Sequence, residues 1–166
     1  SVGLLESMDR AQFGDERLTK RLVTIVDRLS SKPNMSIPAA MNGRAEMEAA
    51  YRFFDNPKVT PEAILAPHIA ATLERVRQTG LALFVQDTTE IDVTRPEQQV
   101  LGAGPMSRES RRGAFYHPLF AFDADGLPLG TIWSTFWARE TSTEDTPRAE
   151  AYKRLPLEQK ESRYWL

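Results

Sequence analysis

Apolar residues recur at three- and four-residue intervals through the first half of the chain, which predicts helices. The clearest case begins after Asp15, a residue type that caps helix N-termini, and runs to Leu29. Leu18, Leu22 and Ile25 would share its inward face. The basic side chains of this helix would then lie on the opposite face or at its edges.

Two further helices are expected before Gly80. One covers residues 39–54, and its core candidates are Met41, Ala45, Ala49, Tyr51, Phe53 and Phe54. Asn56-Pro57 should end it, because the residue before a proline disfavours helix. Thr60-Pro61-Glu62 then begins a helix that should reach Gln78. Residues 13–80 are therefore predicted to be helical.

The pattern changes after Gly80 from helical spacing to short apolar runs. Leu81–Val85 is such a run, typical of a buried strand. Strands are also predicted at residues 114–122 and 129–137, and the Asp125-Gly126 turn signal makes them antiparallel neighbours. Residues 139–163 are charged and polar, which indicates loop or surface helix.

Composition and charge narrow the class of protein. The chain has 166 residues, of which 41% are hydrophobic and 27% charged, as in a folded domain or two small ones. The absence of cysteine excludes disulfides and thiolate zinc sites. No membrane span or signal peptide is visible, so a cytoplasmic location is expected. A net charge of -2 is not that of a stand-alone DNA-binding domain, so any nucleic-acid surface must be local.

Asp87 is the main candidate for chemistry, because it follows directly after the apolar run. A carboxylate held at a strand end can bind a hard divalent cation. Phosphoryl-transfer enzymes commonly use two such ions about 4 Å apart, so one aspartate needs partners. Glu90 and Asp92 are near in sequence, but in a continuing strand Asp87 and Asp92 would face opposite sides. From spacing alone, a plain turn residue at position 87 remains the alternative.

Basic side chains gather at three places: Arg17, Lys20 and Arg21 in the first helix, Arg44 near the start of the second, and Arg108, Arg111 and Arg112 in the loop at 102–113. The arginine fork suits phosphate oxygens and guanine edges. The alternative is a solvated face, since Asp15, Glu16, Glu46 and Glu109 are interleaved with them. His117, in the second predicted strand, reads as a structural group rather than a ligand.

Five segments carry a family resemblance. They are Phe13–Val23; Ala49–Val59; Gln86–Glu90; His117 with Asp125–Gly130 and Trp137–Arg139; and Lys160–Trp165. In this order, over nearly the whole chain, they resemble the IS-four type of bacterial insertion-sequence transposases, the DDE group that includes the transposase of transposon Tn-five.

The resemblance implies an α+β protein with two parts. Residues 1–59 would form an all-helical domain, and residues 60–166 the first three strands of an RNase H-like mixed sheet. The function implied is sequence-specific binding of the inverted-repeat ends of a transposon. Arg17, Lys20, Arg21 and Arg44 would contact double-stranded DNA. Asp87 would be the first catalytic aspartate and a ligand of Mg²⁺ or Mn²⁺.

The family acts as a homodimer that pairs two DNA ends, at the bacterial nucleoid, and cuts and joins DNA by phosphoryl transfer. Its second aspartate and its glutamate are expected beyond Leu166. We therefore expect this chain to bind DNA ends without cutting them, and to expose an apolar edge or face of its sheet. Two alternatives remain: a nuclease that uses Asp87, Glu90 and Asp92, and a small structural or interaction module.

Overall fold

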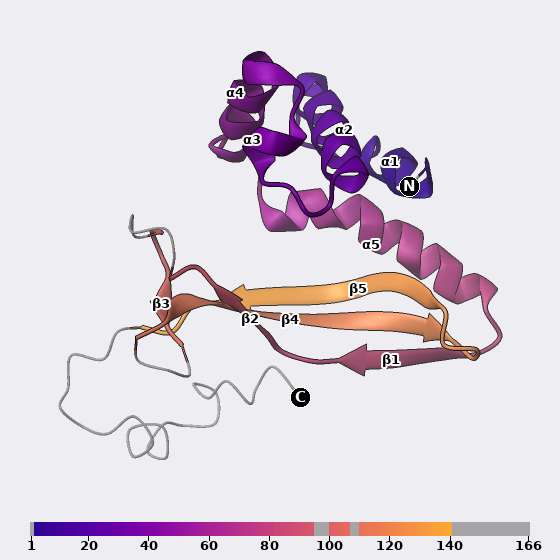
Figure 1. The fold of residues 1–166 in the computed structure, drawn as a ribbon. Helices are drawn as coiled ribbons and strands as arrows, with labels where there is room; N and C mark the ends of the chain where they lie inside the picture. The colour runs from indigo at the N-terminus through magenta and orange to yellow at the C-terminus, as the bar shows by residue number, and fades with distance from the viewer. Residues whose placement is uncertain (1, 95–99, 107–109, 141–166) are drawn as a thin grey trace.

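A computed structural model describes residues 2–94, 100–106 and 110–140, and shows a helical region followed by a sheet (Figure 1). Five helices precede five strands within these residues, so the expected α+β class is confirmed. Most of the polar segment at 139–163 lies outside the described residues, as do Arg108, Glu109 and Lys160–Trp165. In the described part, no helix has the length and apolar character needed to cross a membrane.

The helical region consists of four helices before residue 60: α1 (Val2–Met8), α2 (Glu16–Ser31), α3 (Ile37–Ala40) and α4 (Gly43–Phe54). Asp15 caps α2 as predicted, because its Oδ1 accepts the N–H of Arg17 at 2.9 Å. Helix α1 lies in a segment for which no helix was predicted.

The predicted helix over residues 39–54 is wrong at its start. The chain leaves helical geometry at Met41 and Asn42, which separate α3 from α4. Gly43 has φ +84°, a left-handed conformation that a continuous right-handed helix cannot include. The Asn-Gly pair at this point is a turn signal, and it outweighs the helix-forming residues around it.

A single apolar core joins these four helices. Its buried members are Met8, Ala11, Phe13, Leu22, Ile25, Ala40, Met41, Ala50 and Phe53. The rings of Phe13 and Phe53 meet edge to face, with centroids 5.6 Å apart. Three of the predicted core residues of α4 are exposed instead, namely Ala45, Tyr51 and Phe54.

Helix α5 (Pro61–Gln78) links the helical region to the sheet, and Figure 1 shows it running between them. Thr60 caps it as predicted, with its hydroxyl accepting the N–H of Ala63 at 3.1 Å. The first turns of α5 pack on the helical core through Ala63 and Ile64. Its later turns lie against the last strand of the sheet.

The sheet is built around one long strand. Its strands are β1 (Ala82–Gln86), β2 (Thr89–Asp92), β3 (Gly104–Pro105), β4 (Arg112–Asp123) and β5 (Pro128–Trp137). Every described pairing is antiparallel and involves β4. The predicted β4–β5 hairpin is confirmed, with Gly126 in its turn at φ +82°. The short strands β2 and β3 were not predicted.

Strand β1 lies at an edge, and the expectation that it is buried is wrong. Leu83, Phe84 and Val85 are each about half exposed, at 48%, 54% and 51%. An apolar run signals a strand, but it cannot tell a covered strand from an open one. The exposed apolar edge expected from the sequence is therefore present at β1.

Candidate nucleic-acid interface

Basic side chains form one stripe along α2. Arg17, Lys20, Arg21 and Arg28 recur at helical spacing on the same side of the helix. Arg17 and Lys20 are exposed and Arg21 is half-buried. At 1.5 Å of rise per residue, the stripe spans ~16 Å of the helix axis. The exposed charge of the stripe lies at Arg17 and Lys20, in the first two turns of α2.

Two of the predicted DNA contacts already have acidic partners. Arg17 donates through Nη2 to Asp15 Oδ2 at 2.9 Å, and this pairing lowers the pKa of Asp15. Arg44 donates through Nε to Glu48 at 2.7 Å. Both arginine side chains remain nearly 90% exposed, at 89% and 87%. Exposed pairs contribute little, so a phosphate can replace either carboxylate.

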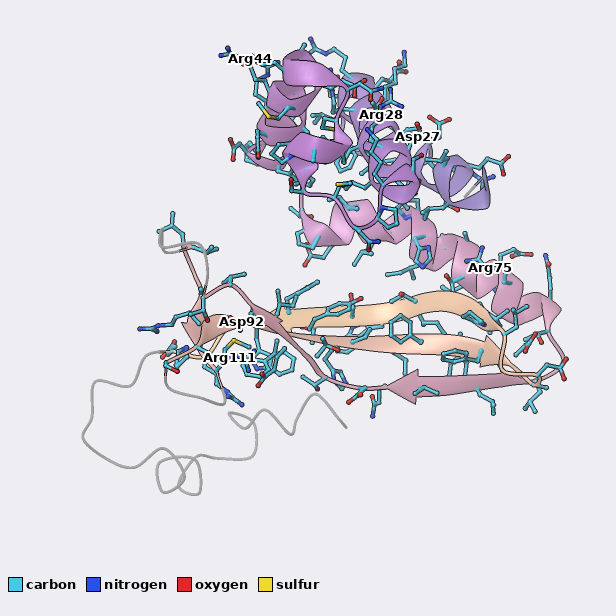
Figure 2. All side chains as sticks on the ribbon, in the orientation of Figure 1. Asp27, Arg28, Arg44, Arg75, Asp92 and Arg111 are labelled. Atoms are coloured by element: carbon cyan, nitrogen blue, oxygen red, sulfur yellow. The ribbon has the colours of Figure 1, made fainter. Side chains whose placement is uncertain are left out.

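Arg28 has a different role from the other arginines, which the sequence did not reveal. It makes a two-pronged contact with Glu46 of α4, through Nε and Nη2, each at 3.0 Å. Glu46 also accepts the N–H of Asn42 at 2.8 Å, at the start of α4. This clamp joins the last turn of α2 to the beginning of α4. Figure 2 labels Arg28 on α2 and Arg44 on α4.

The clamp also brings the stripe and the start of α4 together. The charge of Arg21 contributes to lowering the pKa of Glu46, after the larger effects of the hydrogen bonds from Arg28 and Asn42. Arg21 of α2 thus lies near the end of α4 that carries Arg44. Arg17, Lys20 and Arg21 lie within the first two turns of α2, and Arg44 is the second residue of α4, so the four predicted contacts come from the beginnings of two helices.

Asp87 lies in the sheet, between β1 and β2, and its side chain is exposed. Glu90 and Asp92 follow in β2, where the alternation of side chains places them on the other face from Asp87. Arg111 pairs with the carboxylates of both Glu90 and Asp92. Its Nε donates to Asp92 at 2.8 Å, and its Nη1 donates to Glu90 at 3.2 Å (Figure 2 labels Arg111 and Asp92).

The surroundings of Asp92 are those of a structural ion pair. Hydrogen bonds from the hydroxyl and N–H of Thr94, then from Arg111, lower the pKa of Asp92 to about 2. The carboxylate therefore stays charged and engaged at neutral pH. A nuclease built on Asp87, Glu90 and Asp92 does not match this arrangement.

The described residues fit a divalent cation only in part. Asp87 offers the oxygen chemistry that Mg²⁺ and Mn²⁺ prefer. Within the described residues, however, no group of three or more histidine, aspartate or glutamate side chains is placed to hold a metal ion. One carboxylate alone cannot make such a site.

Comparison with known proteins bears on the helical region. Residues 4–59 match the family model of a transposase DNA-binding domain. The match ends just before α5 and includes the α2 stripe, the clamp and Arg44. These side chains therefore lie within the stretch of the chain that is similar to a transposase DNA-binding domain.

Proposed function

We propose that this chain binds the inverted-repeat DNA ends of a transposon, as part of a cut-and-paste DDE transposase of the IS-four type. The observation that carries the proposal is the match of residues 4–59 to a transposase DNA-binding domain. The exposed stripe of Arg17 and Lys20 on α2 supports it, because phosphate contacts supply most of the affinity of such proteins.

Arg21 and Arg44 complete the proposed DNA surface. They lie near the clamped junction of α2 and α4, where two helices present charge together. Arginine at such a place can read a guanine edge as well as a phosphate. We assign sequence preference to this junction and general affinity to the Arg17 end of the stripe.

Asp87 is proposed as one carboxylate of the metal site at which the family cuts DNA, with Mg²⁺ or Mn²⁺ as the ion. Further ligands would have to come from outside the described residues. When bound, the ions would neutralise charge on the transferring phosphoryl group. Pairing of two DNA ends by two copies of the chain is part of the same proposal.

Selection of bound sequences from a random duplex DNA library tests the proposal directly. We expect enrichment of one motif, and an affinity for it that falls steeply with salt. Arg17→Ala and Arg44→Ala should each reduce the slope of log K against log salt by about 0.9, the value for one lost phosphate contact. Arg77→Ala is the control, because Arg77 is exposed on α5 outside the matched region.

No enriched motif, together with a shallow salt slope, would count against the proposal. It would favour an interaction module whose basic residues are only a solvated surface. Two of the four predicted contacts are paired with carboxylates, which is what that alternative also requires.

A further inference from the structure

Strands β1 and β2 share one register on β4, although the ladder is interrupted between them. Gln86 ends β1 opposite Leu119, and Thr89 begins β2 opposite Tyr116. Asp87 and Thr88 therefore have no ladder partner on β4, whereas His117 and Pro118 opposite them are paired with β5. Together, β1 and β2 line one edge of β4 in the way that one continuous strand would. Only the ladder is interrupted between them, and the register does not change.

Pro118 lies opposite this gap on β4. Val93 donates its N–H to the carbonyl of Arg112, and hydrogen-bonded positions alternate along an antiparallel pair. By this alternation, every second residue of β4 from Arg112 onward points its backbone N–H and C=O groups toward β1 and β2. Pro118 is one of these residues. In the shared register Pro118 comes opposite Asp87. Because proline has no N–H, the carbonyl of Asp87 has no ladder donor there.

Thr88 bridges this gap with its own polar groups. Its N–H donates to Asp87 Oδ1 at 2.7 Å, and its hydroxyl forms a hydrogen bond of 2.7 Å with His117 Nδ1. His117 is fully buried, with the rings of Trp133 and Trp137 at 6.2 and 6.4 Å. The imidazole is thus a fixed anchor, and Thr88 connects it to the carboxylate of Asp87.

We propose that Thr88 and His117 are positioning residues for Asp87. The side-chain hydrogen bond between them replaces the ladder bond that Pro118 cannot make. It holds the edge strand at the gap, and through the N–H of Thr88 it fixes the orientation of the Asp87 carboxylate. The use of that carboxylate as a metal ligand rests on the proposed function, whereas the positioning does not.

Two variants at position 88 separate the hydroxyl from the shape of the side chain. Thr88→Val keeps the branched shape and removes the hydroxyl, and Thr88→Ser keeps the hydroxyl. Three-bond couplings of isotope-labelled protein report the χ1 rotamer of Asp87. We expect one rotamer in the parent and in Thr88→Ser, and averaged couplings in Thr88→Val. Thr94→Val is the control, because its hydroxyl bonds Asp92 on the other face.

The same samples, titrated with Mn²⁺, give a second measurement. Paramagnetic broadening of the Asp87 and Thr88 amides that is absent in Asp87→Asn would report metal binding by the carboxylate. Removing a group that orients a ligand typically weakens metal binding 10-fold or more, so we expect about a tenfold loss in Thr88→Val.

The outcomes distinguish the two proposals. Averaged couplings in Thr88→Val with no broadening in the parent would support the positioning role and count against Asp87 as a ligand in this chain. Couplings in Thr88→Val that equal those of the parent would overturn the positioning role, whatever Mn²⁺ does.

Discussion

Asp15 has two interactions that can be separated by one substitution. Its carboxylate caps α2 through the N–H of Arg17 and also pairs with the guanidinium of the same residue. Asparagine caps a helix about as well as aspartate but carries no charge. Asp15→Asn therefore keeps the cap and releases Arg17 for a phosphate.

We predict that Asp15→Asn binds duplex DNA a few times more tightly than the parent, with a steeper salt dependence, because one acidic competitor of the phosphate is gone. Binding isotherms at several salt concentrations measure this. Asp9→Asn removes the same charge from an exposed site at the end of α1 and serves as the control. Equal gains in the two variants would mean that Arg17 does not lie at the interface.

How far the sequence predicts single residues depends on how local their interactions are. The cap by Asp15 was predicted because cap and helix are adjacent. Asp87 became a candidate because it follows an apolar run, but only the family resemblance gave it a catalytic role, which stays a prediction. The contact of Arg28 with Glu46 was not predicted, because those residues are 18 positions apart in the sequence and meet only when α2 and α4 pack together. The family resemblance, rather than any spacing, is what singled out Arg17, Lys20, Arg21 and Arg44.

Among the helices, this charged contact adds to the apolar core at the junction of α2 and α4. Glu46→Gln keeps an oxygen for Asn42 but removes the charge that faces Arg28. We predict a Tm lower by about 2–4 °C, the scale for one lost interaction in a chain of this size, and weaker selection of the preferred DNA motif. Glu74→Gln is the matched control, because its partner Arg77 is exposed on α5 and lies outside the region that matches the DNA-binding domain.

Thermal unfolding and competition between preferred and random DNA measure these two effects. A Glu46→Gln protein with the parent's Tm and the parent's motif preference would show that the clamp does not orient α4. Loss of Tm alone, with motif preference intact, would limit the clamp to a role in stability.

The strands show what a sequence pattern leaves undetermined. The apolar run at Leu81–Val85 correctly predicted a strand. The run does not indicate whether other helices or strands cover its side chains. That is decided by which strands pair, and β1 pairs only with β4 among the described strands. The break between α3 and α4 was in principle readable, because glycine after asparagine favours the left-handed turn observed at Gly43.

Helix α5 secures the outer edge of β5 through a group that titrates. The Nε2 atom of His68 accepts the N–H of Thr131 at 3.2 Å, which requires a neutral ring, and Arg75 donates to the carbonyl of Leu129 at 2.7 Å. Burial, and then the charge of Arg75, lower the pKa of His68 below its ordinary 6.5. Since the unfolded chain takes the proton first, this contribution to stability is complete above pH 6.5 and is lost as the pH falls through the folded value.

We predict that the free energy of unfolding falls more between pH 7.5 and pH 5 in the parent than in His68→Gln, whose amide does not titrate. Denaturant unfolding at the two pH values measures this difference. Because other groups titrate equally in both proteins, the comparison isolates His68. Parallel pH profiles would mean that His68 does not accept from Thr131 in its neutral form.

In the part of the chain that the structure describes, the sheet has one protected edge at β5 and one open edge at β1. Helix α5 binds backbone groups of β5, while β1 at the opposite side exposes its apolar side chains. Leu83 and Val85 share a face with Phe120, the residue opposite Val85, and all three are exposed. An exposed apolar strand edge is a template for association with another chain.

We therefore predict concentration-dependent self-association that Val85→Lys reduces, because a charge at the centre of β1 opposes both strand pairing and apolar contact. Light scattering over a concentration series measures it, and a fall in binding of an apolar dye should accompany it. Leu127→Lys adds the same charge at an exposed turn away from this edge, and should change neither property. A parent protein that stays monomeric and monodisperse at high concentration would contradict the prediction, and would mean that the twist and the gap at Asp87 are enough to prevent pairing at this edge.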